Sequence, residues 1–361
     1  MEAKIIQTLS MNSGSLNTIA FKKILRDKLS VFCFIVISIY IIISVFAYFI
    51  APDKTPMGNE MHLELSTLPP FSEINFIEID KEITQNKKDF FQTLIYGKYS
   101  DKKRIPISEY KIIDNNIYYT IYNSENKKVF NGEFKITNTT YWLGTDKYGR
   151  DMLSRMIYGS RVSLSVGFIA VLISLLLGVS LGAISGYYRG RVDDFIMWLI
   201  NVVWSIPGLL LAIAITLALG KGFWQVFIAI GLTMWVEVAR LVRGQIFQIR
   251  ELEYIEAGRI LGYSSFRIIF KHILPNIIGP LIVISAANFA SAILIESGLS
   301  FLGIGVQPPH PSWGSMIKDH YAYIIMDKAY LALVPGLAIM SIVLSFMLLG
   351  NGIRDAFDVK S

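Results

Sequence analysis

The sequence predicts an all-α polytopic membrane protein with about six transmembrane helices and a small α+β extracytoplasmic insert between the first and second of them. Hydrophobic residues make up 53% of the 361 residues, charged residues make up only 17%, and the mean hydropathy is +0.48. These values are too apolar for an ordinary soluble domain. Several apolar runs are long enough to cross about 30 Å of hydrocarbon, and one long polar stretch separates the first run from the others.

The apolar runs divide the chain into predicted segments. The six runs are 31–51, 162–185, 195–219, 223–242, 277–304 and 331–350. The segments, in order, are a cytoplasmic tail 1–30, the first span 31–51, the insert 52–140, an interfacial segment 141–161, a core 162–353 with five further spans and a cytoplasmic loop 245–276, and a cytoplasmic tail 354–361.

Basic residues set the predicted orientation. They gather in the first tail, in the loop that holds Arg189 and Arg191, in loop 245–276 and after the last span. Short loops rich in lysine and arginine stay on the cytoplasmic side, so both termini are predicted to be cytoplasmic. The first run has no small-residue cleavage site and is interpreted as an uncleaved anchor. These loops account for the net charge of +6, which needs no nucleic-acid partner.

The insert is predicted to be a small folded unit without a catalytic or metal site. Residues 80–96 favour a helix, and residues 117–122 and 128–136 resemble a β-hairpin region with a turn at Asn131 and Gly132. Its one histidine, His62, stands alone, and its scattered carboxylates are interpreted as a solvated surface and not as a metal site. A contact surface for a delivery protein is a second interpretation.

The stretch 251–275 lies between two spans and carries the most information. Apolar residues recur there at helical spacing with charged residues between them, which predicts two short amphipathic helices. Gly262 suits the left-handed residue that ends the first helix, Ser264 suits the N-cap of the second, and Pro275 is predicted to end it. Such a pair indicates docking to a partner; the alternative is a surface helix pair without one. The predicted apolar side of the second helix is Phe266, Ile269, Phe270 and Ile273.

These residues resemble the "EAA" loop of bacterial ABC importer permeases. The resemblance implies the type I ABC importer permease fold and a coupling helix that lies in a cleft of an ATPase subunit. Gly258 departs from the family, because a second alanine is more common there, and it weakens the helix by about 1 kcal/mol. The residues that carry the resemblance, and that it assigns to ATPase coupling, are Glu256, Ala257, Gly258, Gly262, Ile273, Leu274 and Pro275.

A second motif, within residues 142–164, resembles the C-type membrane subunit of dipeptide, oligopeptide and nickel importers. Residues 301–316 and 335–359 resemble the same branch, although the insert is longer than we expect there. The motif is predicted to form an interfacial helix whose arginines reach headgroups or carboxylates, and we favour this role over substrate contact. The motif residues are Gly144, Asp146, Gly149, Arg150, Asp151, Arg155, Gly159 and Arg161.

Glu296 is the notable charge within the predicted spans. It lies near the outer end of the fifth span, where an unpaired carboxylate is costly. One interpretation places it on the translocation pathway, where it would meet a cationic group such as a peptide amino terminus. The other, which we favour, pairs it with an arginine of this or a partner subunit. Pro207 and Pro280 predict local kinks in the third and fifth spans.

No phosphate-binding, H-E-x-x-H or G-x-S-x-G string occurs in the chain, nor does a metal-spaced Cys/His cluster. The chain is therefore predicted to be neither an enzyme nor a binder of a metal or cofactor. The resemblance implies a permease subunit of an ATP-driven importer of short peptides in the bacterial cytoplasmic (inner) membrane. It also implies partners: a second homologous permease, two ATP-binding subunits that hold ATP and Mg²⁺, and an extracytoplasmic substrate-binding protein.

Alternative functions stay open at this point. A nickel or metal-chelate importer shares the motifs, and no pocket residue in the sequence separates it from a peptide importer. An ion-gradient-driven transporter would need buried ion-coupling charges in several spans, whereas Glu296 is nearly isolated. That class also gives the stretch 251–275 no role, and a membrane enzyme lacks any catalytic motif.

Overall fold

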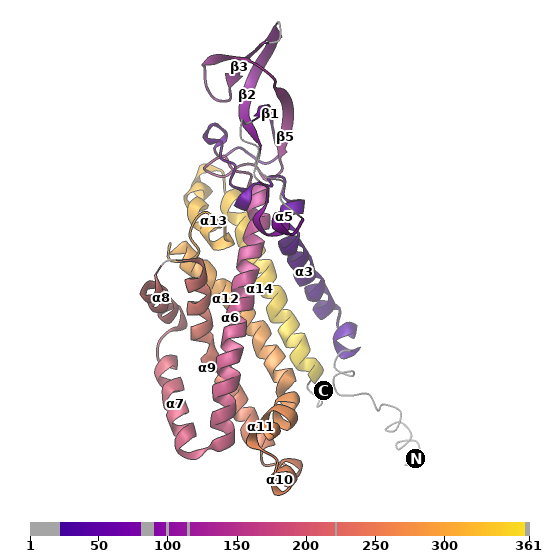
Figure 1. The fold of residues 1–361 in the computed structure, drawn as a ribbon, viewed down its shortest axis with the longest axis vertical. Coiled ribbons are helices and arrows are strands. Elements are labelled where there is room, and N and C mark those ends of the chain that lie inside the picture. Colours follow the sequence, from indigo (N-terminus) through magenta and orange to yellow (C-terminus); the bar gives the residue numbers. More distant parts are fainter. Residues whose placement is uncertain (1–21, 81–89, 99–100, 114–115, 221, 358–361) are drawn as a thin grey trace, which may run out of the picture.

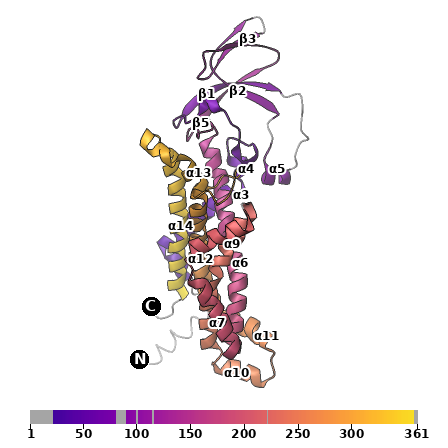
Figure 2. The same cartoon turned by 90° about the vertical axis from the view of Figure 1, so that its left-hand side faces the viewer.

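The protein is elongated, with a β-sheet at one end and a long helical bundle below it (Figure 1). Helices α10 (Glu253–Ile260) and α11 (Ser265–Arg267) project from the bundle at the opposite end (Figures 1 and 2). We call the two ends the sheet end and the loop end. The computed structural model describes residues 22–80, 90–98, 101–113, 116–220 and 222–357.

Five helices of the described residues are long and apolar enough to cross a membrane. A sixth span results if α7 (Gly190–Trp204) and α8 (Gly208–Leu219) are counted together, although they are bent by 91° relative to each other. The predicted helical membrane protein is thus confirmed, with five or six spans. The five helices are α3 (Lys28–Val45), α6 (Met152–Tyr188), α9 (Phe223–Ile249), the run Ser265–Phe301 that ends in α12 (Ile278–Phe301), and α14 (Tyr330–Phe357).

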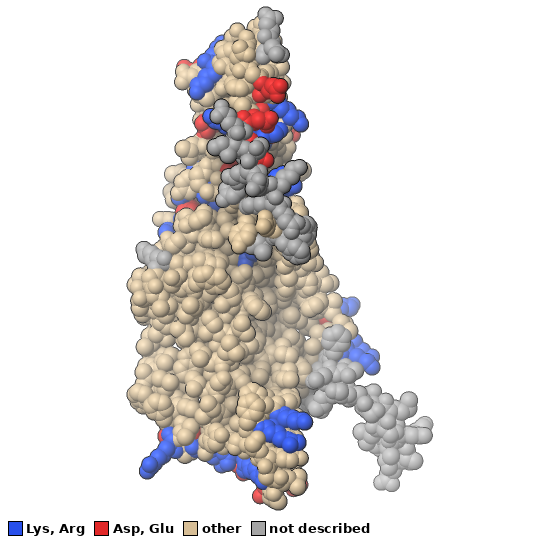
Figure 3. All heavy atoms as spheres, in the orientation of Figure 1, with Lys and Arg blue, Asp and Glu red and all other residues tan. Residues whose placement is uncertain are grey.

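A belt with few charged side chains surrounds the bundle. In Figure 3, lysine, arginine, aspartate and glutamate gather over the sheet end and the loop end, and the surface between them is mostly uncharged. Large apolar side chains are exposed in this belt, among them Phe168 and Leu176 of α6 and Trp198 of α7. In lipid such side chains need no cover, and a helix satisfies its own backbone polar groups. The surface is that of a multi-pass membrane protein.

The predicted third span, 195–219, is broken and not merely kinked. Helix α7 ends at Trp204, α8 begins at Gly208, and Pro207 between them has an extended ψ of 128°. A proline lacks the N–H that would continue the helix, and it disfavours the helical conformation in the residue before it. Pro280 has no such effect, because it lies in the first turn of α12, where a missing N–H is tolerated.

Helix α6 is the axis of the bundle. It spans 37 residues and contacts α9, α12, α3 and α7. A Cβ atom on Gly178 would lie 2.5 Å from Cβ of Val238, and one on Gly182 would lie 2.5 Å from the carbonyl oxygen of Ala239. Small residues let helices approach closely in lipid, where burial of apolar area gives little drive for association. The two glycines therefore allow α6 and α9 to touch.

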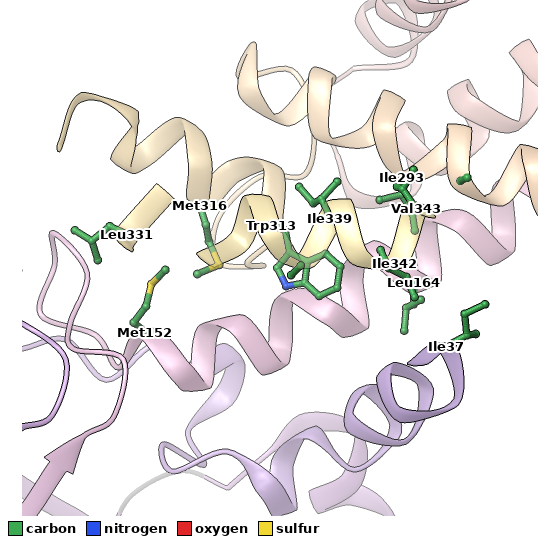
Figure 4. Packing of buried hydrophobic residues seen from close by; sticks show 12 residues of the cluster. Ile37, Met152, Leu164, Ile293, Trp313, Met316, Leu331, Ile339, Ile342 and Val343 are labelled. Atoms are coloured by element: carbon green, nitrogen blue, oxygen red, sulfur yellow. The ribbon is translucent and has the colours of Figure 1, made fainter. Parts of the chain in front are cut away.

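Helix α13 (Trp313–His320) fills the sheet end of the bundle. Its Trp313 and Met316 side chains lie between α6 and α14, close to Met152 (Figure 4). The Trp313 indole N–H donates a hydrogen bond to the Met156 carbonyl at 3.0 Å, so the buried ring is also satisfied as a donor. Ser312 caps the helix through a capping box. The connection between α12 and α14 is thereby held against α6.

The insert contains a five-stranded antiparallel sheet with the strand order β4-β3-β2-β1-β5. One apolar core of the sheet forms around Ile77, Ile107 and Ile117. A second core, around Leu65 and Phe76, joins the sheet to the loop below it. The strands are β1 (Ser72–Asp80), β2 (Lys102–Ile113), β3 (Asn116–Ile121), β4 (Lys127–Asn131) and β5 (Lys135–Tyr141). The short helical elements outside the spans are α4 (Ala47–Ile50), η1 (Pro56–Gly58), η2 (Leu63–Leu65), α5 (Phe90–Tyr96) and η5 (Tyr321–Met326).

The predicted hairpin region needs a correction. Strands β3 and β4 do pair as a hairpin, with Tyr118 opposite Val129, but their turn lies before Lys127. Asn131 and Gly132 instead follow β4, which is one edge strand, and lead to β5, which is the other edge strand. Alternation of side chains marks strands but does not decide which of them pair. The predicted helix in 80–96 is present as α5, and residues 81–89 lie outside the described part.

A buried cluster fastens the insert to α6. The fully buried Asp146 carboxylate accepts hydrogen bonds from the backbone N–H groups of Tyr148 (2.8 Å) and Arg150 (2.9 Å) and from Nε of Arg150 (2.7 Å). Nε of Arg155 lies 3.5 Å from the same carboxylate. Arg150 also donates to the Asn59 side chain at 3.1 Å. Arg150 and Arg155 therefore reach a carboxylate, which is one of the two targets predicted for the arginines of this motif.

The predicted interfacial segment, 141–161, is not a separate helix. Helix α6 begins at Met152, so residues 152–161 are its first turns. Asp151 is the N-cap and accepts a hydrogen bond from the Ser154 N–H at 2.8 Å; burial raises the pKa of its carboxyl. The Arg161 guanidinium lies 5.5 Å from the centre of the Tyr48 ring. Because α6 is continuous, the insert is attached directly to the end of a membrane-spanning helix.

A substitution at Gly149 tests the joint, by which we mean the packing of the insert against the first turns of α6. Its φ is +69°, and a Cβ atom there would lie 1.7 Å from the His62 carbonyl oxygen. We expect Gly149→Ala to lower the midpoint of thermal unfolding of the purified protein, because the left-handed backbone alone costs about 1–2 kcal/mol and the clash adds to that. Gly208→Ala is the control, since nothing lies within 4 Å of its Cβ position. Equal melting of the two variants would contradict the packing of the joint.

Candidate functional site

The projecting loop (residues 251–277) is the candidate site. It extends from the loop end of the bundle, beyond α6 and α9, as both views show (Figures 1 and 2). It contains α10 and α11, followed by the π-helical turn η3 (Ile268–Ile273) and the 3₁₀ turn η4 (Leu274–Ile277). These turns lead directly into α12.

Helix α10 ends as the sequence predicts, at a glycine. Gly262 has a φ of +74°, its N–H donates to the Arg259 carbonyl (2.9 Å), and the N–H of Tyr263 donates to the Gly258 carbonyl (3.0 Å). This pair of bonds is the Schellman motif. The Ser264 hydroxyl then accepts from the Arg267 N–H at 3.4 Å and caps the next helical segment. The turn between the two helices is thus set by local sequence.

Pro275 does not end the second helix, which corrects the predicted boundary. Helical turns continue from Ser265 to Phe301; they widen over η3 and tighten over η4. A proline clashes with a carbonyl one turn before it and removes a donor, and a π-helical turn before the proline changes the local carbonyl pattern so that the helix can continue. The Asn276 amide donates to the His272 carbonyl at 2.6 Å. An unbroken helical stem therefore joins the loop to α12.

The apolar residues of the loop divide into two sets. The inward set, Ile255, Ile268, Ile269 and Ile273, is buried against α6 and α9. The outward set has no cover from the described residues: Ile260 is 81% exposed, Leu261 69% and Phe266 70%. The predicted apolar side of the second helix is therefore split, because Ile269 and Ile273 anchor it while Phe266 and Phe270 face outward. Uncovered apolar patches of this kind mark interaction sites.

The predicted coupling residues are distributed over both sets. Glu256, Ala257 and Gly262 are exposed on the outer surface of the loop, while Gly258 is buried. A Cβ atom at Gly258 would lie 3.3 Å from the Tyr263 ring, so the glycine permits a tight turn. Ile273 is fully buried in the stem, Leu274 is half-buried, and Pro275 is exposed. The loop thus presents a charged and apolar outer surface on an anchored base.

An apolar groove of about 510 Å³ lies between the loop and α6. Phe266 and Phe270 line it from the loop, and Leu172, Leu176 and Ala183 line it from α6. The two phenylalanine rings pack against each other with centroids 4.3 Å apart and an angle of 32° between their planes. The exposed patch therefore continues from the end of the loop onto the side of the bundle.

Charged residues at the loop end tie the helices together in a way that sequence reasoning missed. Asp193 of α7 receives two hydrogen bonds from Arg243 of α9, both 2.6 Å long, and a third from the Ser185 hydroxyl of α6. Arg189 forms an ion pair with Glu251 at 2.7 Å. From the sequence, the arginines of these loops indicate only the orientation of the chain. The sequence does carry a signal for these ion pairs, because each of the two basic loops also contains an acidic residue, Asp193 in one and Glu251 in the other.

The other predicted site residues lie away from the loop. The motif residues from Gly144 to Arg161 form the joint at the sheet end. The fully buried Glu296 accepts a hydrogen bond from the Ser300 hydroxyl at 2.6 Å, and no arginine of the described residues forms an ion pair with it. No cluster of three or more histidine, cysteine, aspartate or glutamate side chains in the described part is arranged to hold a metal ion.

The end of α10 provides a test of the loop geometry. We expect amides 262 and 263 to exchange with deuterium faster in Gly262→Ala than in the wild type, because alanine at a φ of +74° costs about 1–2 kcal/mol and the Schellman bonds open. Gly262→Asn should exchange more nearly like the wild type, since asparagine tolerates the left-handed region. Identical exchange in all three proteins would show that the bonds do not depend on this glycine.

Comparison with known proteins identifies a family that matches the second half of the chain and relatives that align with about two thirds of it. The profile of the family "Binding-protein-dependent transport system inner membrane component" matches residues 178–360, which include the projecting loop. The glutathione transport system permease protein GsiD of Pectobacterium atrosepticum is 38% identical over 67% of this chain and 80% of its own length.

Two further relatives are of the same kind. The dipeptide transport system permease protein DppC of Alkalihalophilus pseudofirmus is 43% identical over 61% of this chain and 72% of its own length. The oligopeptide transport system permease protein OppC of Bacillus subtilis is 38% identical over the same shares of the two chains. The resemblance inferred from the motifs is therefore confirmed, and the chain belongs to the family of binding-protein-dependent transport system inner membrane components, the permease subunits of ABC importers.

Proposed function

We propose that this chain forms one half of the translocation pathway of an ATP-driven importer for short peptides. The observation that carries the proposal is the uncovered apolar surface of the projecting loop, held on a helical stem that runs into α12. Burial of a large apolar side chain contributes about 1.5–3 kcal/mol. Docking of Ile260, Leu261 and Phe266 on a partner would therefore supply substantial binding free energy.

The partner proposed for this surface is an ATPase subunit. Ile255 holds the inner side of α10 against the bundle, so a displacement of α10 reaches the spans without passing through a flexible linker. Closure of two ATPase subunits on ATP and Mg²⁺ would move the loop and shift the bundle between two states that each favour different ligands. A second homologous permease would complete the pathway, and an extracytoplasmic binding protein would deliver the substrate.

Short peptides are the proposed substrates. The relatives described above are named for glutathione, dipeptides and oligopeptides, which favours peptide over nickel or a metal chelate. An ion-gradient-driven mechanism receives less support, because Asp193 is neutralised by Arg243 and the projecting loop would have no role. The chain itself is proposed to have no catalytic activity.

The charge distribution supports the proposed orientation. Basic residues gather at the loop end (Figure 3). Arg189 at the α6–α7 corner, Arg250 after α9 and Lys271 in η3 belong to this part of the chain. Lysine and arginine favour the cytoplasmic side of a membrane. We therefore place the projecting loop and both termini in the cytoplasm and the sheet outside the bacterial inner membrane, within a bundle of the type I permease fold.

A cross-linking experiment tests the docking surface. In a Cys33→Ala background, Ala257→Cys is expected to capture an ATP-hydrolysing subunit in membranes when a short thiol-reactive cross-linker is added, because Ala257 is exposed on the outer surface of α10. Val129→Cys, which is 56% exposed on the sheet, is the control and should capture no ATPase. Capture of no nucleotide-hydrolysing protein at Ala257 would remove the basis of the proposal.

Uptake measurements test the substrate. Cells that carry the complete transporter should accumulate a labelled di- or tripeptide, and excess unlabelled peptide should compete while nickel should not. Glu256→Lys should lower this uptake by more than about fivefold while the protein stays in the membrane, since it reverses a charge on the exposed docking face. Uptake of nickel but not of peptide would favour the metal alternative.

A further inference from the structure

Arg189 has a backbone conformation that arginine rarely adopts. It lies at the corner between α6 and α7 with a φ of +57° and a ψ of −168°. This region is populated almost only by glycine and is costly for a residue with a side chain. Gly190, the next residue, also has a positive φ. A corner that served only to reverse the chain would be formed more cheaply by glycine at both positions.

The Arg189 side chain bridges the corner and the projecting loop. Its Nη2 atom lies 2.7 Å from Oε1 of Glu251, and its guanidinium carbon lies 4.6 Å from the centre of the Phe247 ring. Glu251 stands between the end of α9 and the start of α10. Arg189, the residue in the strained conformation, therefore forms an ion pair with the residue at which the projecting loop begins.

Further contacts cross the same boundary. Arg250 donates a hydrogen bond to the Tyr187 carbonyl, and its Nε lies 3.4 Å from Oε1 of Glu251. The Arg259 guanidinium of α10 lies 5.4 Å from the Tyr187 ring. Burial, together with the positive charges of Arg189 and Arg259, lowers the pKa of Arg250. The Glu251 carboxylate thus lies among guanidinium groups that would repel one another without it.

Hydrogen bonds join three helices next to the corner. Asp193 of α7 is held by Arg243 of α9 through two bonds of 2.6 Å, and it also accepts the Ser185 hydroxyl of α6. Ser185 and Asp193, each four residues from Arg189, therefore take part in a contact that joins three helices. Because these bonds join α6, α7 and α9, a displacement of Arg189 would be passed to all three helices.

We propose that Arg189 and Glu251 form a coupling clamp, which ties the α6–α7 corner to the projecting loop so that a movement of α10 reaches α6 and α7 as well as α12. This inference rests on the proposed function, because it assumes that an ATPase moves the loop. Both residues act through position and touch neither ATP nor substrate. The side chains are 40% and 60% exposed, so the pair contributes modestly and shifts a two-state equilibrium by about fivefold at most.

The test measures ATP hydrolysed per peptide imported by the complete transporter in proteoliposomes. Arg189→Gly removes the clamp and relieves the strain, so its midpoint of thermal unfolding should be unchanged or higher while the ATP used per peptide rises by about twofold to fivefold. A merely structural arginine would not raise this ratio in a variant of undiminished stability. Arg191→Gly is the matched control, because Arg191 is exposed at the same corner, and its ratio should equal that of the wild type.

Charge reversal provides the second variant. Glu251→Arg should raise the ATP used per peptide, and the double variant Arg189→Glu with Glu251→Arg should return it towards the wild-type value. Normal coupling in Arg189→Gly, in a preparation whose wild type imports peptide, would overturn the clamp alone. If Arg189→Gly fails to assemble, the double variant decides, and failure of the swapped pair to restore coupling would overturn the clamp. No ATP-driven import by the wild type would overturn the proposed function and the clamp with it.

Discussion

The close contact between α6 and α9 is the constraint on which the rest of the structure depends. Two glycines on α6 bring its backbone against Val238 and Ala239, and no larger residue fits at that distance. At about 1.5 Å per residue, the 37 residues of α6 extend about 55 Å. The helix carries the insert at one end and the α6–α7 corner at the other. Because α9 leads into the projecting loop, the same contact also fixes where that loop begins.

Ion pairs that include a buried carboxylate lie at both ends of this axis. At the sheet end, Asp146 is neutralised by Arg150 and Arg155. At the loop end, Asp193 is neutralised by Arg243. Removing one partner from such a pair leaves an uncompensated charge and costs several kcal/mol. Ion pairs therefore hold both ends of the bundle, and the projecting loop beyond them presents the exposed side chains of Ile260, Leu261 and Phe266.

Proline positions show where sequence reasoning was incomplete. Pro207 breaks its span with a bend of 91°, whereas Pro275 stays inside a continuous helical stem. The local chemistry of the two residues is the same, since each lacks an N–H. What differs is the surroundings: buried isoleucines and the Asn276 side chain hold the turns around Pro275, whereas α7 and α8 separate at Pro207. Whether a helix breaks at a proline therefore depends on the side chains packed around it and not on the proline alone.

The sequence by itself determined the class of the protein, the apolar spans, the glycine that ends α10 and the family, because hydropathy, capping and motifs are local properties of the chain. It could not show that Ile269 and Phe270, neighbours on one predicted apolar face, are separated into anchor and exposed surface. Nor could it show that Arg189 meets Glu251, or that Arg150 and Arg155 converge on Asp146. The Arg189–Glu251 contact exists only after α6 and α9 have packed, and the cluster around Asp146 forms only once the insert has folded onto the start of α6. The direction of a long side chain depends on what lies beside it.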